Sequence, residues 1–146
     1  MTISKSVFAI VLTTVLATGA VLYFSSQETD LQCVARSTMI SRGQDWVTKH
    51  VPYSQEKTYD GYRTDCSGFV SMCWELAKPG LTTFTLNTVS HGVTKAELQP
   101  GDAMNCASHH VVLFAGWNDG GKTQYIAMEE ANTAEGAVKK VIPYPY

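Results

Sequence analysis

The sequence predicts an α+β domain in which N-terminal helices precede a small antiparallel β-sheet. Two stretches before residue 80 carry apolar residues at helical spacing. Four short stretches after residue 100 have strand-like composition and are separated by turn residues. The residues "NDGG" at 118–121, between the second and third of these stretches, are a strong hairpin signal. A chain of 146 residues has room for one modest domain.

The first 24 residues are expected to be a signal peptide or an N-terminal membrane anchor, outside the folded domain. Lys5 precedes an uncharged run from Val7 to Phe24, in which no amphipathic face is visible. Small residues at 17–19 suit a signal peptidase, whereas roughly 18 apolar residues can also span a bilayer. Residues 25–31 then form a linker, and residues 32–146 form the domain. We expect that domain to be exported: secreted, periplasmic, or tethered outside the cytoplasmic membrane through residues 7–24.

The elements of the domain follow in order. Apolar residues within 39–47 predict a first helix, which Pro52 ends. Residues 54–64, "SQEKTYDGYRT", are typical of a polar, turn-rich loop. A second helix is expected from about Cys66 to Ala77, terminated by Lys78-Pro79-Gly80. Residues 81–99 look irregular, and after a turn at 100–101 we expect strands at 102–106, 110–117, 123–131 and 137–144.

The stretch "DCSGFV", residues 65–70, gives a cysteine the position that a nucleophile needs. A thiol reacts as its thiolate, and the unpaired N–H groups of a helix's first turn stabilise that anion. Asp65 is a good N-cap for such a helix, Ser67 adds a local donor, and Gly68 allows a chain segment or a substrate to approach closely. We therefore take Cys66 as the candidate nucleophile.

A nucleophilic cysteine needs a base, and His109 and His110 open the most hydrophobic predicted strand. Alternation places these two side chains on opposite faces, and the sequence does not say which face meets the Cys66 helix. Glu129 and Glu130 lie on the next strand, also on opposite faces, and one of them can pair with the histidine. Such a glutamate would raise the pKa of the imidazole and favour a thiolate–imidazolium pair.

The motifs "DCSGFV", "LQPGD" and "HHVVLF", in this order, resemble those of the NlpC-type family of papain-like cell-wall cysteine peptidases. The resemblance extends from about Ala35 to Pro143. It implies a papain-like fold with Cys66 as nucleophile, His110 as base and His109 as second choice. The sequence departs from the family at the third catalytic position, where the family often has histidine. In "YIAMEEAN" we assign Glu129 to that position by register, with Glu130 as second choice.

The same resemblance implies a substrate and a set of supporting residues. The substrate is the stem peptide of peptidoglycan, usually cut after D-glutamate, and the reaction needs no cofactor. Tyr53, in "VPYSQ", resembles a family tyrosine that lies beside the catalytic cysteine. Backbone N–H groups around Cys66 and Ser67 would bind the oxyanion, and Asp65 completes the expected substrate-side residues. An exported enzyme would meet this polymer outside the membrane.

Several alternatives remain open. The same residues would serve an amidase or acyltransferase on another substrate, or an inactive binding module. A zinc site built on Cys106, His109 and His110 lacks the usual second pair of ligands, so we expect no metal. Export permits a disulfide from Cys33 to Cys73 or to Cys106, but Cys66 and Cys73 stand about 10 Å apart along one helix and cannot pair. A net charge of −2 argues against a nucleic-acid partner.

Overall fold

The computed structural model describes residues 2–5 and 34–145. A long helix, a hairpin and a short helix precede most of the strands, so the fold class is α+β, as predicted. In chain order the elements are β1 (Thr2–Lys5), α1 (Arg36–Thr48), β2 (Ser54–Tyr59), β3 (Tyr62–Thr64), α2 (Cys66–Cys73), the 3₁₀ helix η1 (Leu86–Val89), β4 (Ser90–Gly92), β5 (Ala103–Cys106), β6 (His110–Trp117), β7 (Gln124–Glu130) and β8 (Ala137–Pro143).

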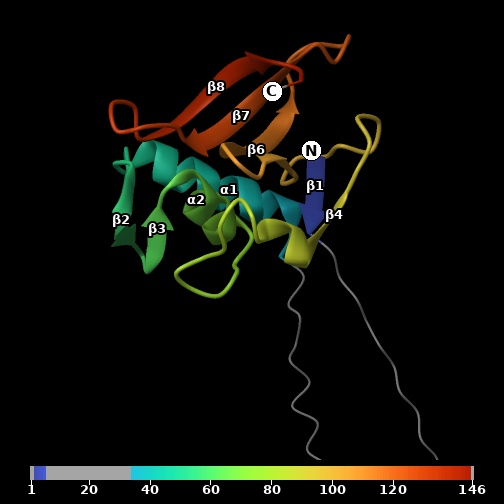
Figure 1. The fold of residues 1–146 in the computed structure, drawn as a ribbon. Coiled ribbons are helices and arrows are strands. Elements are labelled where there is room, and N and C mark those ends of the chain that lie inside the picture. Colours follow the sequence, from blue (N-terminus) through green and yellow to red (C-terminus); the bar gives the residue numbers. More distant parts are fainter. Residues whose placement is uncertain (1, 6–33, 146) are drawn as a thin grey trace, which may run out of the picture.

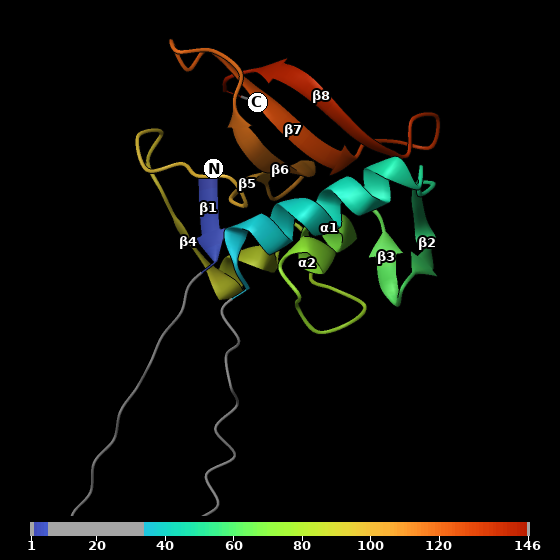
Figure 2. The ribbon, with the colours of Figure 1, turned by 180° about the vertical axis from the view of Figure 1, so that it is seen from behind.

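The main sheet has six strands in the order β4-β1-β5-β6-β7-β8, and all of its pairings are antiparallel. Strands β2 and β3 form a separate two-stranded hairpin. Figure 1 shows α1 and α2 below β6, β7 and β8, with the β2–β3 hairpin beside one end of the helices and β1 and β4 beside the other. The view from behind in Figure 2 shows the same two layers.

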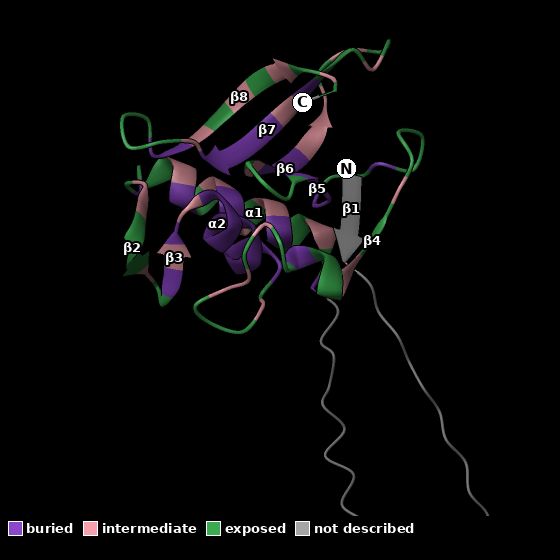
Figure 3. Cartoon of the chain, viewed as in Figure 1, coloured by how far each residue is buried: buried purple, intermediate pink, exposed green. Residues whose placement is uncertain are grey.

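The main core fills the space between the helices and the sheet. It includes Trp46 of α1, Phe69 of α2, Leu113 of β6 and Met128 of β7. A second apolar cluster, with Phe114 and residues of the neighbouring strands, forms on the opposite face of the sheet. Figure 3 shows α2 buried along its whole length, as expected for a helix that packs on several sides.

Helix α1 follows the predicted pattern. Its buried residues, Met39, Gly43 and Trp46, recur at the spacing of one helical face. Gly43 lets α1 approach α2, because a Cβ there would lie 3.2 to 3.3 Å from atoms of Phe69, Met128 and Cys73. The helix ends at Thr48, before the proline that was expected to stop it.

Helix α2 is shorter than the predicted range of 66–77. It ends at Cys73, and Glu75 has a φ of 53°, which a right-handed helix cannot contain. The Trp74 side chain also turns toward the sheet and donates a hydrogen bond to the Gly101 carbonyl oxygen at 2.7 Å. This tertiary contact, rather than the proline at 79, accompanies the early end of the helix.

Residues 54–64, expected as a loop, form the β2–β3 hairpin instead. Asp60 and Gly61 have φ values of 52° and 82°, the left-handed pair of a tight hairpin turn. The Asp-Gly dipeptide was the available signal. The hairpin was not predicted because β2 is polar and largely exposed, so no alternation of apolar and polar residues marks the strand.

The four predicted C-terminal strands are confirmed as β5 to β8, and residues 81–99 contain only η1 and β4. One difference concerns the N-terminus, because Thr2–Lys5 forms strand β1 between β4 and β5. The segment 1–24 was expected outside the domain, and the uncharged run and the linker lie outside the described residues. Within residues 2–5 and 34–145, no helix has the length and hydrophobicity needed to cross a bilayer.

Candidate active site

Cys66 is the first residue of α2, and the start of this helix is capped as the sequence predicted. The Asp65 side chain accepts a hydrogen bond from the Gly68 backbone N–H at 2.6 Å. The Asp65 carbonyl oxygen accepts the N–H of Phe69 at 2.9 Å, the first regular bond of the helix. The N–H groups of Cys66 and Ser67 belong to the first turn, which has no intrahelical acceptors. The Cys66 side chain thus lies at the positive end of α2.

The structure brings Cys66, His110 and Glu129 together. His110 is the first residue of β6, and interaction with the Cys66 side chain is among the causes that raise the pKa of its imidazole. Its Nε2 lies 2.6 Å from Glu129 Oε2 on β7. Cys66 is 8% exposed and belongs to the main core cluster, and His110 is the polar group that interacts with it. The arrangement is a cysteine–histidine–carboxylate series.

Electrostatics favour a charged imidazole at this site. Burial by itself lowers the pKa of His110, but hydrogen bonds and attraction to Cys66 and Glu129 outweigh it and raise the pKa to about 9. Burial likewise acts to raise the pKa of Glu129, and the hydrogen bonds from His110 and Lys140 outweigh it, so this pKa is lowered. His110 therefore holds a proton, and Glu129 is ionised, at neutral pH.

Lys140 on β8 completes the charge balance around Glu129. Its ammonium nitrogen lies 3.1 Å from Glu129 Oε1, the oxygen that does not face His110. A second carboxylate, that of Glu135, lies 3.6 Å from the same nitrogen. Each oxygen of the nearly buried Glu129 carboxylate thus faces a cationic partner, which is how a buried charge becomes tolerable. Lys140 was not predicted as part of the site, because no local pattern shows that β8 pairs with β7 in this register.

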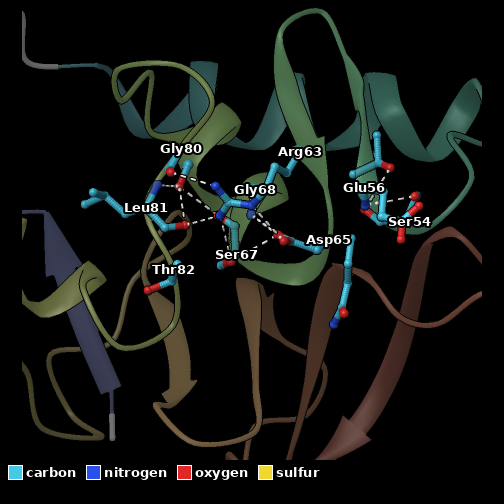
Figure 4. A network of polar contacts seen from close by, with 12 residues as sticks. Ser54, Glu56, Arg63, Asp65, Ser67, Gly68, Gly80, Leu81 and Thr82 are labelled. Carbon is cyan, nitrogen blue, oxygen red and sulfur yellow. Dashed lines mark hydrogen bonds and ion pairs between the residues drawn. The ribbon is translucent and has the colours of Figure 1, made fainter.

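Arg63, on β3, was also missed, and Figure 4 shows that it organises the start of α2. Its Nε donates to Asp65 Oδ2 at 2.8 Å, and one of its terminal nitrogens lies 3.3 Å from Ser67 Oγ. The same guanidinium donates to the carbonyl oxygens of Gly80 at 2.9 Å and Leu81 at 2.7 Å. It therefore balances the N-cap carboxylate and ties the loop that follows α2 to the turn that carries Cys66.

Gly68 allows the close approach that the sequence indicated, and a chain segment makes it. A Cβ on Gly68 would lie 2.0 Å from the carbonyl oxygen of Arg63. No side chain fits there without moving β3. Ser67, predicted as a local donor, is buried and donates through its hydroxyl to Asp65 Oδ1 at 3.0 Å. Its side chain therefore supports the cap.

The two second-choice residues take other positions. His109 is exposed, and its ring centroid lies 6.4 Å from that of His110. Glu130 is fully buried, and among the described residues neither of its carboxylate oxygens has a hydrogen-bond partner. Burial first, and the nearby Asp65 charge second, raise the pKa of Glu130 to about 8, so it is neutral at pH 7. Glu129, rather than Glu130, is the partner of the histidine.

Tyr53 is half-buried in the segment between α1 and β2. Within the described residues its hydroxyl pairs with Gln55, at 3.3 Å, and not with the cysteine or the histidine. The expected position beside Cys66 therefore stays a prediction for this residue.

The remaining cysteines differ from Cys66 in environment. Cys73 is fully buried, and burial raises the pKa of its thiol well above the usual range. Cys106 is exposed, and no disulfide joins these three residues to one another. Cys33 lies outside the described residues, and so do the bridges predicted for it. Within residues 2–5 and 34–145, no cluster of three or more histidine, cysteine or acidic residues could hold a metal ion.

Comparison of the chain with protein-family models and with curated proteins found no match.

Proposed function

We propose that this protein is a papain-like cysteine peptidase that hydrolyses an amide bond in the stem peptide of peptidoglycan. The reaction type is supported by one observation: Cys66 lies at a helix N-terminus and interacts with His110, whose Nε2 lies 2.6 Å from Glu129 Oε2. The substrate rests on the resemblance of "DCSGFV", "LQPGD" and "HHVVLF" to the NlpC-type peptidases. Export of the domain would place it beside that polymer.

The first half of the reaction forms a thioester. The Cys66 thiolate attacks the carbonyl carbon of the scissile amide, and negative charge develops on the carbonyl oxygen. The first-turn N–H groups of Cys66 and Ser67 would stabilise that oxygen. The His110 imidazolium then gives its proton to the leaving nitrogen, the C–N bond breaks, and the amine departs.

The second half releases the acyl group. Neutral His110 takes a proton from water, and the resulting hydroxide attacks the thioester carbonyl. The C–S bond breaks, and the product is a carboxylic acid, with the Cys66 thiolate and the His110 imidazolium restored. Glu129 holds the imidazole in place and stabilises its charged form throughout, and Lys140 keeps Glu129 ionised.

The decisive experiment is digestion of purified sacculi, with the released peptides identified by mass spectrometry. The wild-type protein should release peptides whose new N-terminus is the residue that followed D-glutamate in the stem peptide, and Cys66→Ala should release none. Cys106→Ser is the matched control, since this exposed cysteine lies outside the series, and it should behave as wild type. Equal release by wild type and Cys66→Ala would overturn the proposal. Products that carry a transferred acyl group, without hydrolysis, would indicate an acyltransferase.

A further inference from the structure

A short segment after α2, residues 80–85, connects the two parts of the candidate site. We call these residues the strap. Arg63 donates to the carbonyl oxygens of Gly80 and Leu81, and the Leu81 N–H donates to Ser71 Oγ of α2 at 2.9 Å. Because Arg63 also binds the Asp65 cap, this end of the strap is fixed to the turn that carries Cys66. Figure 4 shows the contacts of Arg63 with Asp65, Gly80 and Leu81.

The other end of the strap is fixed beside the histidine. The carbonyl oxygen of Thr83 accepts a hydrogen bond from the Asn105 side chain at 2.9 Å, and the Thr83 hydroxyl donates to the Ala107 carbonyl oxygen at 2.7 Å. Ala107 lies in the turn between β5 and β6, and Cys106 pairs with His110 across that turn. The strap thus runs from the element that carries the nucleophile to the element that carries the base.

Phe84 lies on this anchored segment with 65% of its surface exposed. Its neighbour Leu86 is fully buried, and the Thr85 and Leu86 N–H groups both donate to Thr82 at 2.9 Å. The backbone on each side of the aromatic ring is therefore held in place. An exposed phenyl ring on a fixed backbone can bind an apolar group with little loss of conformational entropy, because the order already exists in the free protein.

We propose that Phe84 is a specificity-determining residue that packs against an aliphatic side chain on the leaving-group side of the scissile amide. The hydrogen bonds that fix the strap indicate on which side of the scissile amide Phe84 lies. Phe84 is next to Thr83, which is bound to the turn that precedes His110, and His110 protonates the leaving amine. A residue with a chain of methylene groups, such as lysine, fits this subsite, and glycine does not use it. The inference rests on the proposed peptidase function and adds which leaving residue that same site prefers.

The test compares two synthetic peptides that share their acyl part, L-Ala-γ-D-Glu, and differ in the leaving residue, which is either L-Lys or Gly. In Phe84→Ala, kcat/KM for the lysine peptide should fall about tenfold, and that for the glycine peptide by less than about twofold. Phe84→Leu, which keeps an apolar side chain, should retain most of the lysine preference. Val141→Ala is the matched control, since Val141 is another exposed apolar residue, on β8, and should change neither value.

The outcomes separate the two proposals. Equal losses for both peptides in Phe84→Ala, or no loss for either, would overturn the role of Phe84 and leave the peptidase function standing. Failure of the wild-type protein to cleave either peptide, while iodoacetamide still labels Cys66, would overturn the proposed function and this inference with it. The labelling rate of Cys66 in Phe84→Ala should equal that of wild type, which shows that the variant keeps a folded site.

Discussion

At the residue scale, two adjacent glutamates on β7 have opposite electrostatic roles. Glu129 is ionised, because His110 and Lys140 bind its two oxygens. Glu130 is equally buried but has no such partners among the described residues, so it stays protonated at neutral pH. Residue type and sequence position are nearly the same for both. The difference comes from what the neighbouring strands and the helix place around each carboxyl group.

Replacing Glu130 by glutamine should therefore change the stability of the protein, whereas the same replacement at Glu129 should change its activity. The raised pKa of Glu130 gives a contribution to stability that is present below pH 4.5, the usual value, and is lost as pH rises to about 8. Glu130→Gln removes this dependence. Relative to wild type, the variant should gain about 1–3 kcal/mol in the free energy of unfolding between pH 4.5 and 8, as measured by denaturant titration. A stability difference that does not change with pH would contradict this assignment.

Glu129→Gln is the matched variant, because it makes the same chemical change one residue away. It removes the attraction that helps to hold the pKa of His110 near 9, so the alkaline fall in kcat/KM should move to lower pH. It should also lower kcat by about tenfold or more, since the imidazolium loses its anionic partner. If the alkaline fall in kcat/KM stays at the same pH, Glu129 does not influence the pKa of His110.

At the element scale, the start of α2 depends on the contact between this helix and β3. The Arg63 carbonyl oxygen occupies the space where a side chain at position 68 would begin. The Arg63 side chain then reaches Asp65 and the strap. One strand residue thus packs its backbone against the start of the helix and supports both the cap and the strap with its side chain.

Gly68→Ala should consequently destabilise the protein by about 3 kcal/mol, because β3 must move to admit the new methyl group. Gly43→Ala, in α1, is the control. Alanine favours a helix over glycine by about 1 kcal/mol at both positions, but at Gly43 the methyl meets only side-chain atoms, at 3.2 to 3.3 Å. Urea midpoints measure both changes. Equal midpoints for the two variants would contradict the proposed role of the Arg63 carbonyl.

At the scale of the whole molecule, the main sheet includes four residues from the N-terminus. Ile3 pairs with Gly92 of β4 on one side and with Ala103 of β5 on the other, and β4 has no other neighbour in the sheet. A signal peptidase that cut near residues 17–19 would remove β1. Removal of the leader would therefore leave β4 and β5 without the strand that pairs with both of them.

Ile3→Pro tests the pairing in the full chain, since proline lacks the N–H that a central strand needs. Hydrogen exchange should become faster at residues 90–92 and 103–104, and stay unchanged in β7. Ile3→Val, which keeps the N–H and the strand preference, should exchange as wild type. Unchanged exchange at residues 90–92 in the proline variant would contradict the strand pairing.

Much of this architecture follows from local sequence. The spacing of apolar residues predicted α1 and the start of α2, alternation and turn residues predicted β5 to β8, and the "DCSGFV" motif indicated where a reactive cysteine would lie. These features depend on residues within a few positions of one another, so they can be recognised from the sequence alone. The same holds for Asp65, whose capping role depends on a residue three positions away.

Only the tertiary structure decided which groups meet at the site. The pairing of β6 with β7 placed Glu129, the first choice from sequence, beside His110, and the packing of β3 and β8 brought in Arg63 and Lys140. The early end of α2 and the polar β2–β3 hairpin are decided in the same way, by contacts with distant segments. Local sequence fixes helix caps and alternation because these interactions are short in range, whereas the partner of a buried charge depends on which strands lie side by side.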